Sequence, residues 1–232
     1  MTENNNQYIS DASIERFPSH PYLMARLTES ALLKVQDICF ELKNHPLKKS
    51  ANSNLAGNLS EQYYLNNEEQ KVILSIVSPL ADFLFSNSDK DVHTRVTKKS
   101  VDIVWQHQSC WANYQKKYEF NPVHNHTGYF SYVLWVDIPY DIEDEFNLPH
   151  TKNGTIRSAS CFSFHYPDTT GSVRTMDLPL SREDNGLLAL FDSRIMHSVN
   201  PFYTSDKERI SISGNLMPVY SDMPSRPNYK YQ

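Results

Sequence analysis

The feature that most constrains the fold of this chain is the residue pattern of its second half, where short runs of β-branched and aromatic residues alternate with Gly, Pro, Asn and Asp. Runs of this kind, bounded by turn-forming residues at short spacing, are typical of the strands of a β-sandwich or small barrel. The expected strands lie within residues 101–115, 128–138, 156–166, 172–180, 186–192 and 209–219. The second half is therefore predicted to be mainly β.

The N-terminal part has a different pattern. Residues 1–20 are polar and are predicted to be a flexible N-terminus. Apolar residues recur at helical spacing within 31–42, after Thr28, and again within 68–85, which predicts two amphipathic helices. With 232 residues in all, we expect one domain over 21–232, mainly helical over 21–98 and β over 99–220.

Charge and composition limit the classes of partner and the cellular compartment that we expect. The net charge is -5, and Lys and Arg are scattered rather than gathered in a stripe, so nucleic acid is an unlikely partner. Three widely separated cysteines give little support to a disulfide framework or a structural zinc. We expect no leader, because the N-terminus lacks a basic segment followed by an apolar one, and no run approaches the roughly 18 apolar residues of a membrane span. We expect a cytoplasmic protein without membrane contact, whose oligomeric state the sequence leaves unknown.

Two histidines in the segment 121–128 indicate a metal site. His124 and His126 are two residues apart, just before a turn and a strongly apolar strand. On a strand such residues share one face, so both imidazoles can converge on a single ion. A third ligand must come from elsewhere, and the candidate is His197, which follows the apolar strand that starts at Gly186.

Arg209 and Ser211 follow the distal histidine on the last predicted strand. Because they also share one strand face, a guanidinium fork and a hydroxyl are offered to one carboxylate, as a dicarboxylate co-substrate would need. The alternative is that Arg209 pairs with Asp206 or Glu208 at a strand edge, which would be a weak exposed interaction.

Other polar residues near the predicted strands are weaker candidates. Asp192 precedes the distal histidine by five residues, at a strand end where Asp is commonly structural. His107, His150 and His165 have no matching partner, so we expect them to form hydrogen bonds outside the metal site.

The arrangement resembles the 2-oxoglutarate/Fe(II)-dependent oxygenase superfamily, in which a His-x-acid pair, a distal His and a following Arg, often Arg-x-Ser, line a double-stranded β-helix. His124, His126, His197, Arg209 and Ser211 fall on those places. More narrowly, residues 55–65, 110–139 and 186–215 look like the oxygenases of tailed bacteriophages of marine bacteria. The resemblance covers roughly residues 50–218.

The resemblance implies an α+β, mainly β fold, a double-stranded β-helix of the jelly-roll or cupin-like kind with N-terminal helices packed on it. It implies Fe(II), 2-oxoglutarate as co-substrate and O2, with hydroxylation of an unidentified small molecule or protein side chain and release of succinate and CO2. Asn113, Tyr132 and Trp135 would lie near the co-substrate. A phage-encoded protein would act in the cytoplasm of the infected host cell.

One departure from the pattern leaves two readings. The second position of the triad, usually an acid, has none here. Either His126 replaces the carboxylate in a three-histidine site, which we favour, or His126 is the first ligand and Gly128 takes the acid's place, as in the halogenase branch.

Outside that superfamily two alternatives stay open. One is a cupin-like metal-binding or small-molecule-binding module without 2-oxoglutarate turnover, and the other is a phage structural protein that keeps the barrel without chemistry. The acidic segment 139–154 is expected to be an exposed loop that could cover the site entrance.

Overall fold

The structure, a computed structural model, describes residues 8–16, 21–87 and 103–220. The helices are α1 (Glu29–Asn44), α2 (Asn67–Asn87) and α4 (Ile142–Phe146), with short 3-10 turns at Asn52–Asn54 and Arg182–Asp184. The strands are β1 (Ile9–Arg16), β2 (Pro21–Leu27), β3 (Lys49–Ser50), β4 (Gln62–Tyr64), β5 (Ile103–Gln115), β6 (Asn121–His124), β7 (Phe130–Asp137), β8 (Phe162–Pro167), β9 (Val173–Leu178), β10 (Leu187–Asp192), β11 (Met196–Val199) and β12 (Arg209–Tyr220).

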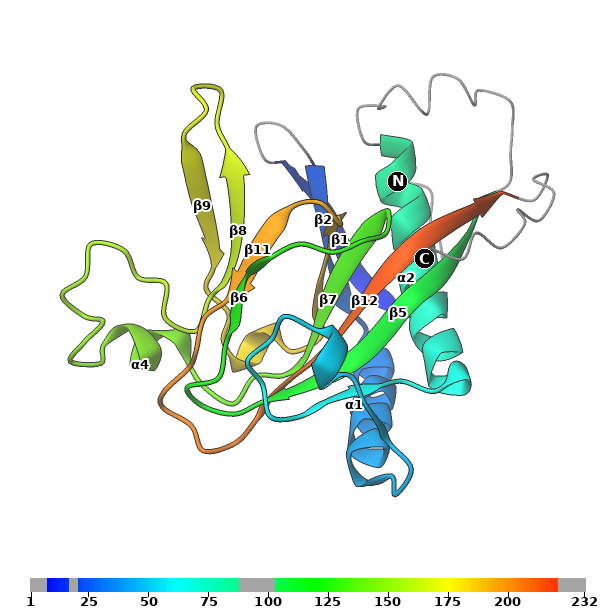
Figure 1. Ribbon diagram of the computed structural model, residues 1–232, viewed down its shortest axis with the longest axis horizontal. Helices are drawn as coiled ribbons and strands as arrows, with labels where there is room; N and C mark the ends of the chain where they lie inside the picture. The colour runs from blue at the N-terminus through cyan, green and yellow to red at the C-terminus, as the bar shows by residue number, and fades with distance from the viewer. Residues whose placement is uncertain (1–7, 17–20, 88–102, 221–232) are drawn as a thin grey trace.

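Two antiparallel sheets form the body of the molecule (Figure 1). The large sheet has eight strands in the order β1-β2-β10-β7-β12-β5-β4-β3, and the small sheet has four in the order β6-β11-β8-β9. Because the chain crosses repeatedly between the sheets, strands distant in sequence become neighbours, as in a double-stranded β-helix. The predicted mainly β fold with this architecture is confirmed.

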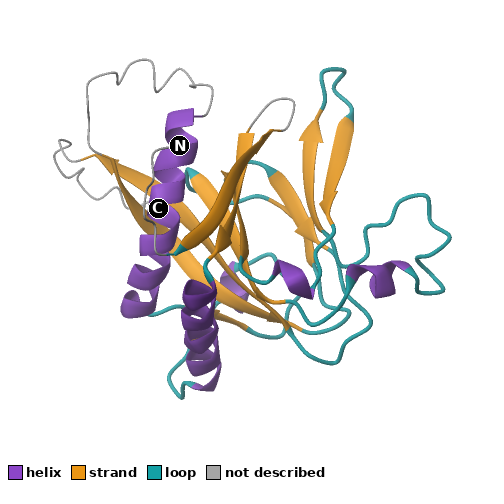
Figure 2. Cartoon of the chain, turned by 180° about the vertical axis from the view of Figure 1, so that it is seen from behind, coloured by secondary structure: helices purple, strands orange, loops and turns teal. Residues whose placement is uncertain are grey.

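The two long helices cover one face of the large sheet (Figure 2). Thr28 caps α1 by accepting from the backbone N–H of Ala31, and α2 begins after Asn66, whose side chain accepts from the N–H groups of Glu68 and Glu69. Their apolar faces share one core with β2, β5, β7, β10 and β12. Within the described ranges, no helix combines the length and apolarity needed to cross a membrane.

A second core, rich in aromatic residues, fills the space between the two sheets. It includes Trp135 of β7, Phe162 and Phe164 of β8, and Phe191 of β10. The large sheet is therefore buried on both faces, by helices on one side and by the small sheet on the other. The opening between the sheets is where the candidate site lies.

The N-terminal segment differs from the prediction of a flexible stretch over residues 1–20. Residues 9–16 form β1, an edge strand paired with β2, and β2 pairs in turn with β10, with Leu23 opposite Leu190. The polar sequence of β1 hid this strand because an edge strand buries little side-chain area. Residues 1–7 and 17–20 of that prediction, and 88–98 of the helical region, lie outside the described residues. That residues 21–232 form one domain stays a prediction.

The acidic segment 139–154 contains α4 and is fastened to the body at several points, among them Tyr140, Ile142 and Glu145. Glu145 of α4 is fully buried, and it accepts hydrogen bonds from the Ser160 hydroxyl and from the backbone N–H groups of Tyr203 and Thr204. In the described part of the chain, the residues lining the cavity at the candidate site do not come from this segment. Its expected role as a cover of the entrance is therefore unsupported.

Candidate metal centre

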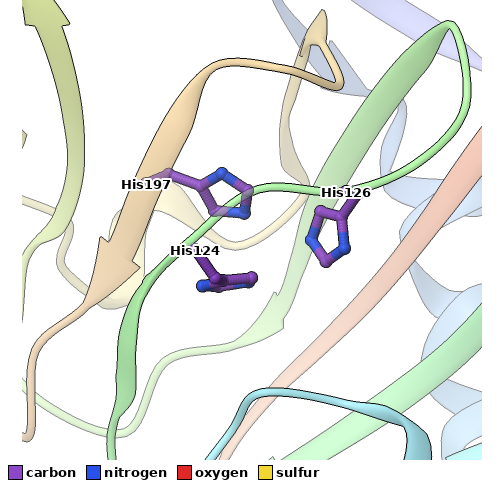
Figure 3. Close-up of side chains that lie close together, drawn as sticks. All are labelled: His124, His126 and His197. Atoms are coloured by element: carbon purple, nitrogen blue, oxygen red, sulfur yellow. The ribbon is translucent and has the colours of Figure 1, made fainter.

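Three histidines converge between the sheets (Figure 3). The ring centroids of His124 and His197 are 4.3 Å apart, those of His124 and His126 are 4.8 Å apart, and those of His126 and His197 are 5.1 Å apart. One possible ligand atom from each lies within 4.8 Å of the other two. The structure thus brings together the three residues that the sequence predicts.

Strand pairing and one loop hydrogen bond place these side chains. His197 of β11 lies opposite His124, the last residue of β6, in an antiparallel pair. His126 lies beyond the strand end, where its backbone N–H donates to the carbonyl of Ser193 at 2.9 Å. The predicted pairing of His124 and His126 on one strand face is therefore wrong in detail, because the chain leaves β6 to turn toward β7 at Gly128, with φ 116°.

Backbone carbonyls fix the tautomers of two of the rings. His124 Nδ1 lies 2.7 Å from the carbonyl oxygen of Pro122, and His197 Nδ1 lies 2.9 Å from that of Ile195. A carbonyl oxygen only accepts, so each Nδ1 carries the proton and donates it. The lone pair is then on Nε2, which is the usual arrangement of a metal-binding histidine oriented by an outer hydrogen bond.

Burial keeps the three imidazoles neutral. It lowers the pKa of His126 to about 4, with the neighbouring His124 adding to the effect. Burial also lowers the pKa of His124, against the opposing effect of its bond to Pro122, and holds that of His197 well below its ordinary value. Near neutral pH all three rings are therefore uncharged, with one ring nitrogen of each free of a proton and able to act as a ligand.

Aromatic side chains from both sheets surround the histidines. Phe162 stacks on the ring of His197 with centroids 5.5 Å apart, and Phe191 meets the same ring edge-on at 5.0 Å. Trp111 lies 5.7 Å from His126. Three neutral imidazoles in an apolar wall suit a divalent first-row ion such as Fe(II), so the donor set fits the metal that the sequence predicts.

The remaining candidates for the metal site are engaged elsewhere. Asp192 binds Arg194 through both carboxylate oxygens. His165 bonds to the hydroxyls of Thr175 and Ser198, and His107 to that of Tyr132. His150 packs against Tyr203. These contacts agree with the expected roles outside the metal site.

Arg209 opens β12 and is almost completely buried, at 4% exposure. Its guanidinium donates five hydrogen bonds, from Nε and Nη2 to Gln115 Oε1, from Nη1 to the Tyr140 hydroxyl and the Ser160 carbonyl, and from Nη2 to the Asn200 carbonyl. The alternative pairing with acids is wrong, because Asp206 pairs with Lys117 and Glu208 with Lys43. The five N–H groups of Arg209 are all donated to protein acceptors.

Ser211 and Asn113 lie beside Arg209, on the sheet face that lines the cavity. Ser211 is opposite Asn113 in the β12–β5 pair, and Asn113 Nδ2 donates to the hydroxyls of Ser211, at 3.1 Å, and Ser213, at 3.2 Å. Each serine oxygen accepts, so each hydroxyl keeps its own hydrogen to donate. Both amide hydrogens of Asn113 are donated in this way, so Asn113 orients the two serine hydroxyls.

The two predicted aromatic residues lie on opposite faces of β7. Trp135 lines the cavity and packs edge-on against Phe162, at 5.6 Å between ring centroids. The side chain of Tyr132 points to the helix side, where its hydroxyl lies 2.9 Å from His107 Nε2 and 3.2 Å from Cys110 Sγ. Tyr132 is also among the residues that line the cavity, so its place near the co-substrate stays a prediction, although residues three apart on a strand face opposite ways.

Several polar residues at the cavity were missed. Gln115, Gln62 and Asn121 line it, while Tyr140 and Ser160 hold Arg209 from behind. The alternation Trp111, Asn113, Gln115 on β5 was a usable signal, because these three residues share one strand face. Gln62 and Asn121 had no such signal, since their strands are short and flanked by irregular chain.

Residues 109–215 match the model of a family described as "Putative 2OG-Fe(II) oxygenase". The matched range includes the three histidines, Arg209 and Ser211. No curated protein matches the chain.

Solved structures share the fold at low identity. The epimerase SnoN from nogalamycin biosynthesis, in complex with Fe3+, alpha ketoglutarate and nogalamycin RO, is 12% identical over 94% of this chain and 91% of its own, with a TM-score of 0.52. The carbocyclase SnoK from the same biosynthesis is 12% identical over 87% and 82%, also with a TM-score of 0.52. A prolyl hydroxylase from Trichoplax adhaerens, in complex with a hypoxia inducible factor peptide fragment, is 14% identical over 85% and 82%, with a TM-score of 0.50. The family match and the shared fold support a distant relationship to the 2-oxoglutarate/Fe(II) oxygenases.

Proposed function

We propose that this protein is a non-haem Fe(II) and 2-oxoglutarate-dependent dioxygenase, which hydroxylates a small molecule or a protein side chain and releases succinate and CO2. One observation carries the proposal: His124, His126 and His197 converge with their possible ligand atoms within 4.8 Å of one another. The family match and the fold that it shares with SnoN and SnoK support the use of iron and 2-oxoglutarate.

The metal would be held by Nε2 of His124 and His197 and by His126. When bound, Fe(II) would supply the binding of 2-oxoglutarate and the activation of O2. The protein's own part is to orient the ligands through Pro122 and Ile195 and to exclude water with the aromatic wall. The geometry favours the three-histidine reading over the one with Gly128, because the His124 ring lies beside that of His197.

The far carboxylate of the co-substrate would lie near Arg209 and Ser211. Since the Arg209 N–H groups already have acceptors, its charge attracts the carboxylate while the hydroxyls of Ser211 and Ser213 donate to it. A direct bond from the guanidinium would require Gln115 to give up one of the two hydrogens that it accepts.

A cupin-like metal-binding module without 2-oxoglutarate turnover is the second candidate. The observation that favours it is the same full set of acceptors around Arg209. The closer resemblance to phage oxygenases stays a prediction, and so does a halogenase-type outcome.

One experiment separates these functions. Anaerobic protein is mixed with Fe(II) and 2-oxoglutarate, and the visible charge-transfer band of the chelate is recorded for the wild type, His197→Ala and Ser211→Ala. We expect the band in the wild type, its loss in His197→Ala, and a weaker affinity for 2-oxoglutarate in Ser211→Ala. Metal binding without any band in the wild type would refute 2-oxoglutarate use and favour the cupin-like module.

A further inference from the structure

The cavity beside the histidines has a second polar group of residues, away from Arg209, that the proposed chemistry does not use. Gln62 of β4 is 1% exposed, and Asn121 begins β6. Both line the cavity, and both have a buried side-chain oxygen, Gln62 Oε1 and Asn121 Oδ1, without a hydrogen-bond partner among the described residues. Buried acceptors without partners are uncommon in folded proteins and carry a desolvation cost.

A chain of hydrogen bonds fixes which atom of the Gln62 amide is without a partner. The indole N–H of Trp111 can only donate, and it donates to Asn113 Oδ1 at 3.1 Å. The atom of Gln62 that lies 2.8 Å from the same oxygen must then be its amide nitrogen. The unpartnered atom of Gln62 is therefore the carbonyl oxygen, and a flipped amide would set two oxygens against each other.

The same network separates the cavity into two ends. Asn113 receives donors from Trp111 and Gln62 on one side and gives its own hydrogens to Ser211 and Ser213 on the other. Hydroxyl donors therefore lie at the Arg209 end, where an anion is suited. Carbonyl acceptors lie at the Gln62 end, where only a hydrogen-bond donor is suited.

Gly57 allows Asn121 Oδ1 to lie close against its backbone at the acceptor end. A Cβ on Gly57 would collide with Asn121 Oδ1 and would lie 3.2 Å from Gln62 Nε2. Any larger residue at position 57 would therefore displace the side chain of Asn121 and press against the amide of Gln62. Leu55 and Leu59, from the same segment, also line the cavity.

The charges around the cavity exclude a cationic ligand as the favoured occupant. Among the described residues that line it there is no Asp, Glu or Lys, and Arg209 is the cation at its far end. An ammonium group at the acceptor end would be desolvated without a counter-charge, which is costly. A neutral donor has no such cost.

We propose that Gln62 Oε1 and Asn121 Oδ1 form the recognition site for the molecule to be oxidised, and that they accept hydrogen bonds from a neutral amide N–H or hydroxyl group. The absence of a side chain at Gly57 leaves Asn121 Oδ1 in its place. This assignment rests on the proposed function, because it names the class of molecule that the oxygenase would oxidise. The binding itself can be measured without turnover.

The test uses small matched probes on the Zn(II)-loaded protein, with binding followed by ligand-observed NMR. Benzamide carries the donor, N,N-dimethylbenzamide lacks it, and benzylamine is cationic. We expect benzamide to bind at least about fivefold more tightly than the other two, as one neutral hydrogen bond to a buried acceptor allows. Gly57→Ala and Gln62→Leu should each remove this preference. Asn58→Ala, an exposed neighbour that bonds to Phe120 through its backbone, should retain it.

Equal binding of benzamide and its dimethyl form by the wild type would overturn the assignment, and so would an undiminished preference in Gly57→Ala. Tighter binding of benzylamine would overturn the neutral class. The charge-transfer band of the wild type is recorded separately. A clear preference for benzamide without the band would refute the oxygenase function and leave the recognition site supported. The band without any preference for benzamide would support the oxygenase function and refute the recognition site.

Discussion

Arg209 and Gln115 face each other across β12 and β5, and Gln115 Oε1 accepts from both Nε, at 3.2 Å, and Nη2, at 2.7 Å, of the guanidinium. The contact joins the charge at the end of the cavity to the strand that also carries Asn113. Its removal should therefore affect stability as well as binding.

Arg209→Lys should lower the free energy of unfolding by about 2–4 kcal/mol, because an ammonium group cannot replace five directed N–H donors and leaves buried acceptors unpaired. Urea denaturation measures this loss. Arg174→Lys, in an exposed ion pair with Asp168, is the control and should change stability by less than about 0.5 kcal/mol. An equally stable Arg209→Lys would show that the five bonds do not hold the strands.

The three-histidine centre predicts an asymmetric response at position 126. His126→Ala should weaken Co(II) binding at least about tenfold, since one ligand is removed, whereas His126→Asp should keep most of the affinity because a carboxylate is an accepted ligand at this place of a facial triad. Titration followed by the visible absorption of Co(II) gives both affinities. Unchanged binding by His126→Ala would mean that His126 is not a ligand.

The stability of the protein should depend on pH through His107. Burial lowers the pKa of His107 to about 4, so the unfolded chain, with an ordinary pKa near 6.5, takes up a proton first as the pH falls. Its contribution to stability is complete above about pH 6.5 and is lost progressively down to about pH 4. Relative to the wild type, His107→Gln should lose about 1–2 kcal/mol less between pH 7 and pH 5, as measured by urea denaturation at both pH values. Equal losses would contradict the assignment.

The buried carboxylate of α4 predicts a strong effect far from the histidines. Glu145 accepts from Ser160, Tyr203 and Thr204, so Glu145→Gln would turn an N–H group toward these donors and should cost about 2–4 kcal/mol. Glu143→Gln, exposed on the same helix, is the matched control and should be nearly neutral. Because the Ser160 carbonyl also accepts from Arg209, the Glu145 variant should bind 2-oxoglutarate less tightly as well.

Much of the fold could be predicted because a strong periodicity of apolar residues distinguishes helices from strands. The helix α1 begins after Thr28 and ends at Asn44, and the strands β10 and β12 lie where the turn residues put them. The strand β1 could not be predicted, since an exposed edge strand has the composition of a loop.

The three histidines that converge were predictable from their places in the sequence, whereas their surroundings were not. The face of the Tyr132 side chain is hard to predict because β7 is buried on both sides, so its residues show no polar alternation to mark the cavity face. Tyr132 and Trp135 are three residues apart, an odd number, which indicates that their side chains lie on opposite faces of the strand. The acceptors of Arg209 come from segments whose proximity only the folded sheets create.

The pairing of β6 with β11 also has a kinetic consequence. His124 and His197 become neighbours only when strands that are distant in sequence have closed the small sheet, and long-range pairing of this kind is a late and slow step of folding. During refolding from urea, the ability to capture Co(II) should therefore appear after the helical signal and together with the burial of the aromatic side chains. The rate of Co(II) capture would therefore report the rate at which the small sheet closes.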